Sequence, residues 1–177
     1  MLIDKNKSSL IVIDVQEKLV SVMPKPQIFI ENIIKLQKAA NILQVPVTYS
    51  EQYPNGLGKT INKIKENTNP KDKLIEKTEF SVSLNINSKT NSQFIITGIE
   101  AHVCVLQTAI NLAVNKEKLI YIVQDGVSSR YQKDYLLALN RLDKYSNIHL
   151  VSCEMVLFEW LRSSNHPNFK TISQLIK

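Results

Sequence analysis

Six short apolar runs alternate with segments of helical spacing, and this alternation constrains the fold more than any other feature of the chain. Most of the runs are continuous and rich in Val and Ile, which is typical of parallel strands buried on both faces. Strands that alternate with helices predict an α/β fold with a parallel sheet. The predicted strands span residues 10–15, 46–50, 73–76, 93–97, 119–124 and 148–151.

The predicted helices repeat apolar residues at intervals of three and four. The helix expected after Phe80 is the least distinct, because Thr90 and its polar neighbours blur its pattern. No internal repeat or interdomain linker is found, so we expect one domain over residues 1–177. The other helices are expected at residues 27–44, 101–116, 131–146, 152–164 and 168–177.

Composition and charge limit the classes of partner. Apolar stretches such as "SLIVIDV" are too short to span a bilayer, and the N-terminus lacks the features of a signal peptide. Two cysteines, Cys104 and Cys153, do not make a disulfide framework, so we expect a cytoplasmic protein. The net charge of +6 comes from lysines scattered among acids. Scattered charge favours a solvated surface, so we expect neither a membrane nor a nucleic-acid partner.

The four glycines all lie just beyond predicted strands. Gly56 and Gly58 follow the second strand, Gly98 ends the fourth, and Gly126 follows the fifth. Loops favour glycine in any case, but the N-terminal ends of the same strands have none. Because ligands of open α/β sheets bind outside the carboxyl ends of the strands, we expect the site at this rim.

Three reactive residues are predicted at the same rim. Asp14 ends the first strand, Lys77 follows the third, and Cys104 is expected in the first turn of the helix after Gly98. An ammonium lowers the pKa of a nearby thiol, so we expect a lowered pKa at Cys104 but not at Cys153. A carboxylate can take the thiol proton and return it to a leaving amine. The pattern alone leaves a second interpretation, in which Asp14 and Lys77 form a structural ion pair and Cys104 fills space.

Three segments resemble the motifs of the isochorismatase-like cysteine hydrolase superfamily, which includes nicotinamidases and N-carbamoylsarcosine amidases. They are "LIVIDVQ", "IEKTEFS" and "ITGIEAHVCVLQTA", and the resemblance covers nearly the whole chain. The segments "SEQYPNGLGKT", "DGVSSR" and "NHPNFKTISQLIK" resemble more closely the branch of isochorismatase domain-containing proteins. Isochorismatases themselves cleave a vinyl ether and lack this cysteine, so the resemblance places the chain with the thiol hydrolases.

The resemblance implies a three-layer α/β/α fold around a six-stranded, mostly parallel sheet. It implies Asp14 as general base, Lys77 as the stabilising cation and Cys104 as the nucleophile that forms a thioester with a small amide-like substrate. It also implies a cis peptide between Ile99 and Glu100, with the backbone amides of Glu100 and Cys104 as the oxyanion hole. The alternative is a non-enzymatic relative that uses the pocket for small-molecule binding or assembly.

The resemblance to nicotinamidases does not extend to their metal site. Their metal ligands follow the second strand, where this chain has "SEQYPNGLGKT" without Asp or His. The three histidines, His102, His149 and His166, lie far apart and have no ligand spacing. We therefore expect neither a metal nor another cofactor.

The loop after the second strand is expected to help form the substrate pocket. Glu51, Gln52 and Tyr53 can present polar groups there, and "PNGLG" also predicts a turn. His102 either lines the pocket or is a partly exposed residue at the helix start. Gln16 is expected to order the loop after Asp14.

Further residues are assigned structural roles. Asp125 and residues 128–130 are expected to hold a loop or a subunit contact, and Cys153 is expected to pack behind Ser152, a plausible helix N-cap. The family resemblance and the apolar segment "MVLFEWL" also predict a homo-oligomer.

Overall fold

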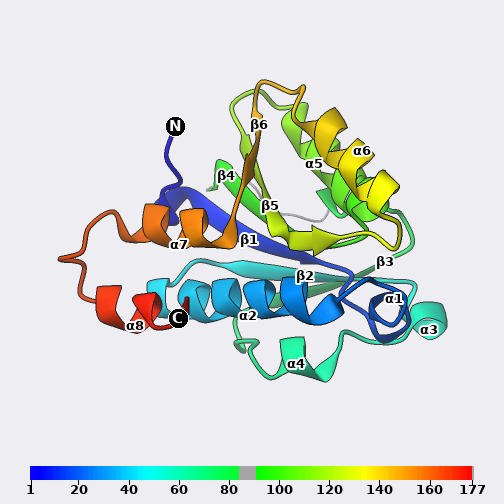
Figure 1. Ribbon diagram of the computed structural model, residues 1–177, viewed down its shortest axis with the longest axis horizontal. Helices are drawn as coiled ribbons and strands as arrows, with labels where there is room; N and C mark the ends of the chain where they lie inside the picture. Colours follow the sequence, from blue (N-terminus) through cyan, green and yellow to red (C-terminus); the bar gives the residue numbers. More distant parts are fainter. Residues whose placement is uncertain (84–90, 177) are drawn as a thin grey trace.

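A computed structural model describes residues 1–83 and 91–176 of the chain. Six strands form one all-parallel sheet in the order β3-β2-β1-β4-β5-β6 (Figure 1). All six predicted strands are present, and the parallel arrangement is confirmed. The strands are β1 (Ser8–Ile13), β2 (Val47–Gln52), β3 (Lys73–Lys77), β4 (Gln93–Ile99), β5 (Leu119–Ser128) and β6 (Ile148–Val151).

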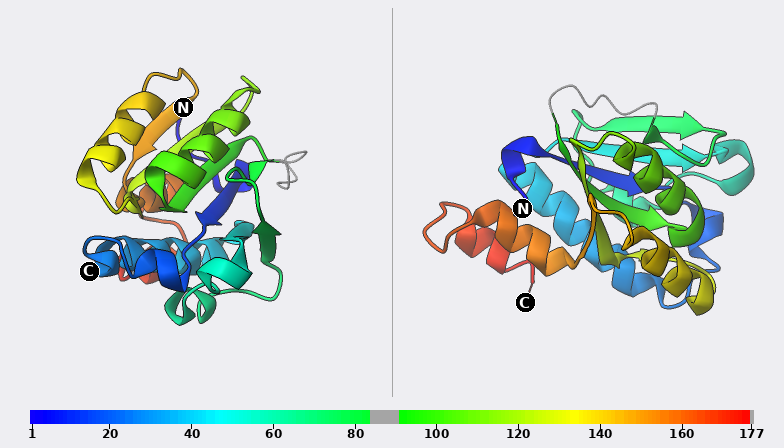
Figure 2. Two further views of the ribbon diagram at one scale, coloured as in Figure 1. Left: turned by 90° about the vertical axis from the view of Figure 1, so that its right-hand side faces the viewer. Right: turned by 90° about the horizontal axis from the view of Figure 1, so that it is seen from above.

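Helices cover both faces of the sheet, which gives the predicted three layers (Figure 2). One face is covered by α2 (Pro26–Leu43), α4 (Asn62–Lys65), α7 (Cys153–Leu161) and α8 (Phe169–Ser173). The other is covered by the π-helical segment η3 (Ala101–Val105), α5 (Leu106–Ala113) and α6 (Gln132–Leu142). The short helices α1 (Glu17–Val20) and α3 (Pro54–Leu57) follow the carboxyl ends of β1 and β2.

The two faces of the central strand β1 contribute to two separate hydrophobic clusters. Leu10 and Val12 contribute to the cluster under α2 and α7, whereas Ile11 and Ile13 contribute to the cluster under α5 and α6. Neighbouring residues of a strand point to opposite faces, so a continuous apolar run supplies both clusters. This is why the run "LIVI" predicts a buried parallel strand.

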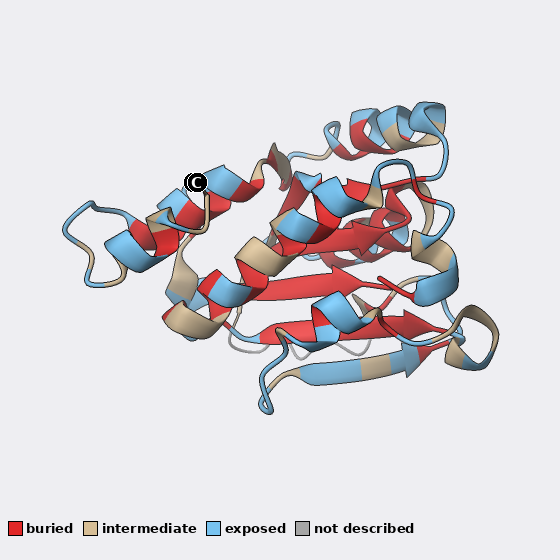
Figure 3. Cartoon of the chain, turned by 60° about the horizontal axis from the view of Figure 1, so that its bottom comes forward, coloured by how far each residue is buried: buried red, intermediate tan, exposed pale blue. Residues whose placement is uncertain are grey.

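The edge strand β3 differs from the central strands in its exposure (Figure 3). Leu74 is exposed, but Lys77, the last residue of the strand, is buried. An edge strand has one unpaired side and is usually marked by charged residues, as β3 is by Lys73 and Glu76. The burial of Lys77 is therefore a local property of the carboxyl end of the sheet.

Gly98 lies inside β4, and Gly126 lies inside β5, so the prediction that all four glycines lie beyond the strands is wrong for these two. Both strands extend farther than their apolar runs. Gly98 has φ +107°, and a Cβ at this position would overlap the carbonyl oxygen of Ile13. Glycine therefore permits the close approach of β4 to β1 beside the candidate site.

The segment after β4 was predicted as one helix over residues 101–116. The structure divides it into the π-helical η3 and the regular helix α5. Single π-helical turns occur frequently at functional sites. The helix expected after Phe80 falls mainly on residues 84–90, which lie outside the described residues. None of the helices among the described residues is long and apolar enough to cross a membrane.

Candidate active site

Asp14 follows β1 directly and is completely buried. Its backbone has φ +51°, in the left-handed region that residues other than glycine seldom adopt. The carboxylate is held from two sides: Oδ1 accepts a hydrogen bond from Ser50 Oγ at 2.6 Å, and Oδ2 accepts one from Lys77 Nζ at 2.7 Å. A buried charge is costly unless it is paired, and here the pairing comes from the two neighbouring strands β2 and β3.

Lys77 uses all the donor capacity of its ammonium group. In addition to Asp14, Nζ donates to Gln52 Oε1 at 2.7 Å and to the carbonyl oxygen of Phe80 at 3.1 Å. The Asp14–Lys77 ion pair is completely buried on both side chains. An ammonium with three acceptors has a fixed position, so its positive charge is held rigidly beside Asp14.

Cys104 lies in η3 and is buried, with 6% of its surface exposed. Its thiol is close enough to Asp14 and Lys77 for both charges to act on its pKa. The three residues predicted as a reactive set are therefore brought together by β1, β3 and η3. The structure also contains the cis peptide between Ile99 and Glu100, as the resemblance implied.

The surroundings of Cys104 raise the pKa of its thiol. Burial is the largest cause, and the negative charge of Asp14 is the next. Lys77 acts in the opposite direction but does not prevail, because its ammonium already pairs with Asp14. The prediction that Cys104 has a lowered pKa is therefore wrong for the free protein. Its thiol carries its proton at neutral pH, with a carboxylate next to it.

A cavity of about 300 Å³ opens onto Cys104. Its wall combines apolar side chains with few polar groups, which is the usual make-up of a small-molecule site. The cavity is lined by Leu19, Gln52, Leu57, Phe80, Glu100, Val103, Cys104 and Arg130.

Gln52 lines this cavity as predicted, but Glu51 and Tyr53 do not. Glu51 precedes Gln52 on β2, so its side chain points to the opposite face. There its Oε1 accepts hydrogen bonds from Thr60 N at 2.6 Å and Thr60 Oγ1 at 2.8 Å. Burial alone raises the pKa of Glu51, but the bonds from Thr60 and the charge of Lys59 outweigh it, and the pKa is lowered.

Tyr53 and His102 also lie outside the cavity wall. Tyr53 is 56% exposed, and its backbone N–H donates to the carbonyl oxygen of Lys77 at 2.8 Å. His102 is partly buried, and its Nδ1 lies 3.0 Å from Ser129 Oγ. This position corresponds to the second interpretation of His102, that of a partly exposed residue at the start of the helix.

Gln16 was expected to order the loop after Asp14, and the structure shows that it joins this loop to residues 52–58 at the carboxyl end of β2. Its Nε2 donates to the carbonyl oxygens of Gln52 at 3.0 Å and Gly58 at 2.7 Å, and its Oε1 accepts from Gln52 N at 2.7 Å. Because Leu57 of the segment 52–58 lines the cavity, these bonds fix part of the cavity wall.

Arg130 is a lining residue that the sequence interpretation had placed in a structural loop. Its backbone N–H donates to Glu100 Oε2 at 3.0 Å, and its Nε lies 3.4 Å from the same oxygen. These contacts agree with the prediction that residues 128–130 hold a loop, but that prediction did not include Arg130 as a lining residue of the cavity. The apolar wall residue Phe80 was also missed, although it follows the carboxyl end of β3, and Leu57 was not named although it lies in the loop that was expected to help form the pocket.

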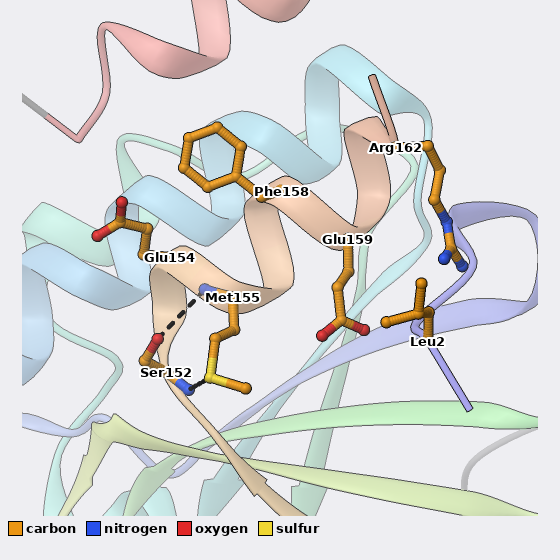
Figure 4. Close-up of a pocket in the computed structure, with 7 residues that line it drawn as sticks. All are labelled: Leu2, Ser152, Glu154, Met155, Phe158, Glu159 and Arg162. Carbon is orange, nitrogen blue, oxygen red and sulfur yellow. Dashed lines mark hydrogen bonds between the residues drawn. The ribbon is translucent and has the colours of Figure 1, made fainter. Parts of the chain in front are cut away.

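No group of three or more His, Cys, Asp and Glu side chains suited to a metal ion occurs among residues 1–83 and 91–176. A larger hollow of about 550 Å³ lies along α7, away from Cys104 (Figure 4). At its end Ser152 caps α7 by accepting a hydrogen bond from Met155 N at 3.2 Å, as predicted. This hollow is lined by Leu2, Ser152, Glu154, Met155, Phe158, Glu159 and Arg162, which offer no nucleophile with an adjacent base.

Comparisons with known proteins identify the family of the chain. The model of the isochorismatase domain matches residues 8–152. Isochorismatase domain-containing protein 2 of Danio rerio is 37% identical over 181 residues, which cover 96% of this chain and 86% of that protein.

Two solved structures share the fold. The MAR1 ribonuclease from Caenorhabditis elegans is 35% identical, with a TM-score of 0.93 over 99% of this chain and 92% of that chain. The ycaC gene product of Escherichia coli, described as an octameric hydrolase of unknown specificity, is 20% identical, with a TM-score of 0.82 over 98% of this chain and 95% of that chain. The second likeness concerns the fold alone. From the domain match and the identity over nearly its whole length, this chain belongs to the isochorismatase family.

Proposed function

We propose that this protein is a cysteine hydrolase that cleaves the C–N bond of a small amide-like substrate through a thioester on Cys104. The observation that carries the proposal is the meeting of a neutral thiol, a buried carboxylate and a fixed ammonium beside the cavity. Family membership supports hydrolase activity in general. The amidase chemistry is inferred from the side chains.

In the first half of the reaction Cys104 Sγ attacks the carbonyl carbon while Asp14 takes the thiol proton. The carbonyl oxygen becomes an oxyanion, for which the backbone amides of Glu100 and Cys104 are the proposed donors. Collapse of the tetrahedral intermediate breaks the C–N bond, and Asp14 returns the proton to the leaving nitrogen. The products of this half are an amine, or ammonia, and the thioester.

In the second half water hydrolyses the thioester. Asp14 takes a proton from the attacking water, and the same proton returns to Sγ as the C–S bond breaks. Lys77 keeps its proton throughout and stabilises the negative charge that moves between Asp14 and the reacting atoms. Because the thiol of the free protein is protonated, a base in contact with it is required at the moment of attack.

A second candidate function is cleavage of RNA, which is favoured by one observation: a solved structure 35% identical to this chain is named a ribonuclease. The composition argument against a nucleic-acid partner does not exclude a short oligonucleotide. The cavity of about 300 Å³ fits a small amide better than a chain of nucleotides, and among the described residues its wall carries one basic side chain, that of Arg130.

A hydrolysis screen tests the two activities together. Small amides, ureides and esters and a single-stranded RNA oligonucleotide are incubated with the wild-type protein and with Cys104→Ala. We expect ammonia or amine release by the wild type only, and an acyl adduct on the Cys104 peptide by mass spectrometry after rapid acid quench. RNA cleavage that survives Cys104→Ala, with no amide turnover, would contradict the proposal. Binding without turnover of any compound would support the non-enzymatic alternative.

We also propose that the reaction needs no metal and that the protein is a homo-oligomer. The exposed apolar side chains of Leu2, Met155 and Phe158 on one surface support assembly. Turnover should persist after dialysis against EDTA, which would remove a required metal. Light scattering at micromolar concentration should give a mass above that of one chain, and a monomeric mass would overturn the assembly.

A further inference from the structure

We propose that the Glu100 side chain recognises a substrate N–H group, so that this site accepts primary amides and ureides in preference to esters. The proposal rests on the proposed function and adds to it a role for the side chain of Glu100, which is separate from the role of its backbone amide. The preference follows because an amide N–H can donate a hydrogen bond to the carboxylate, whereas an ester has no such donor.

The polar groups of the cavity leave few choices for orienting a substrate. Gln52 has both ends of its amide engaged: Oε1 accepts from Lys77 Nζ at 2.7 Å, and Nε2 donates to the carbonyl oxygen of Thr78 at 2.6 Å. Cys104 supplies the reacting sulfur. Among the described residues that line the cavity, Glu100 and Arg130 are the charged side chains.

Glu100 is placed to act at the reacting centre. It is 7% exposed, lines the cavity, and lies near enough to Cys104 for its negative charge to raise the pKa of the thiol. Its Oε2 is held by Arg130, whereas no hydrogen bond to its Oε1 is found within the described part of the chain. An ionised carboxylate only accepts hydrogen bonds, so the group that completes it must be a donor.

Arg130 fixes the orientation of this carboxylate. Its backbone N–H and Nε contact the same oxygen, and its own side chain is 51% exposed at the cavity mouth. The positive charge of Arg130 also offsets the negative charge of Glu100, as the positive charge of Lys77 offsets the negative charge of Asp14. One balanced pair therefore lines the cavity and a second lies buried beside Cys104, which suits an uncharged substrate.

The remaining wall is apolar and limits the acyl part of the substrate. Leu19, Leu57, Phe80 and Val103 are the apolar side chains that line it. Apolar side chains favour the burial of CH₂ and CH₃ groups. A short aliphatic primary amide therefore matches the site in both its polar and its apolar part.

Substrate choice in Glu100→Gln tests the inference. The probes are butyramide and methyl butyrate, which share the acyl group and differ in the leaving group. The measured quantity is the ratio of kcat/KM for the amide to kcat/KM for the ester. We expect this ratio to fall about 10-fold in the variant, because a hydrogen bond to a charged acceptor is replaced by one to a neutral amide.

The ratio distinguishes a change in substrate recognition from a loss of correctly folded protein. Both substrates are measured on one sample, so a smaller active fraction lowers both values equally and leaves the ratio unchanged. Glu79→Gln, the same chemical change at an exposed residue outside the cavity wall, is the matched control and should keep the wild-type ratio. If Glu100→Gln does not fold, Arg130→Met removes the side-chain contact to the carboxylate, keeps the backbone one, and should lower the ratio by a smaller factor.

The outcomes distinguish the inference from the function on which it rests. A fall in the ratio for Glu100→Gln but not for Glu79→Gln supports it. Amide turnover by the wild type with an unchanged ratio in Glu100→Gln, or in Arg130→Met where that variant replaces it, overturns the inference and leaves the proposed hydrolase standing. Absence of turnover of both probes by the wild type overturns the inference together with the proposed function.

Discussion

The two cysteines have similar burial and different neighbours. Cys104 is 6% exposed and Cys153 is 2% exposed, and both are free thiols. Burial is the largest cause of a raised pKa at both, and at Cys153 it raises the pKa to about 12. The pKa of a thiol therefore does not separate a nucleophile from a packing residue here.

What separates the two cysteines is the group that can take the proton and the space next to the sulfur. Cys104 has the Asp14–Lys77 pair beside it and a cavity of about 300 Å³ in front of it. Cys153 begins α7, where its N–H donates to Asp125 Oδ1 at 2.8 Å and its Sγ to the carbonyl oxygen of Asn32 at 3.5 Å. Its thiol serves to join α7 to α2, and no described cavity is lined by it.

The largest contrast is expected from removing each sulfur in turn. Cys104→Ala should lower kcat/KM for the amide found in the screen by about 10³-fold or more, because the nucleophile is lost. Cys153→Ala should keep turnover within a few-fold while lowering stability. Steady-state kinetics on both variants measure the difference. Equal losses of activity would mean that the cysteines differ less than their surroundings indicate.

Replacing Asp14 is expected to change the rates of turnover and of alkylation in opposite directions. Asp14→Asn should reduce turnover by about 10²-fold to 10⁴-fold, the usual contribution of a general base. The same variant removes a negative charge that raises the pKa of Cys104, so iodoacetamide at neutral pH should label Cys104 faster than in the wild type. Cys153 of the same sample is the control, and its labelling rate should not change. Slower labelling of Cys104 would contradict the assigned charge effect.

Removing a lysine from β3 is expected to lower the stability strongly at the buried end of the strand, where Lys77 pairs with Asp14, and very little at the exposed start. Lys77→Met leaves the buried Asp14 without its cation and should lower the free energy of unfolding by about 3–5 kcal/mol. Lys73→Met, at the exposed start of the same strand, should change it by less than about 0.5 kcal/mol. Urea unfolding followed by circular dichroism measures both. Similar losses in the two variants would show that the pair has no special importance.

The smallest expected effect concerns alkaline pH. A thiol with a raised pKa keeps its proton in the folded state, while in the unfolded chain it loses the proton above about pH 8.5. The stability from each thiol is complete below that pH and falls as pH rises towards the folded pKa, at up to about 1.4 kcal/mol per pH unit. Between pH 8.5 and 10, Cys104→Ala and Cys153→Ala should each lose less stability than the wild type. Parallel curves in urea unfolding would argue against buried neutral thiols.

Much of the fold follows from local patterns. The six strands were predicted because buried parallel strands need continuous apolar runs, as in residues 10–13 of β1. Their ends were less certain, because the extensions of β4 to Ile99 and β5 to Ser128 depend on pairing with neighbouring strands. Gly98 was identified as a special position, but the reason, the closeness of Ile13, is a contact between two strands.

The sequence by itself identified the residues that we propose carry the chemistry. Asp14 and Lys77 lie at the ends of apolar runs, Cys104 lies at the start of the helical segment after the fourth run, and the motifs around them resemble those of one superfamily. This information is local, because a strand delivers the residue at its carboxyl end to the rim of the sheet wherever its neighbours lie.

Only the tertiary structure decided how these groups behave. The raised pKa of Cys104, the orientation of Glu51 away from the cavity and the pairing of Glu100 with Arg130 all depend on distances between residues far apart in the chain. Charge interactions and burial are set by those distances and by the exclusion of water, and neither quantity is present in the order of the residues.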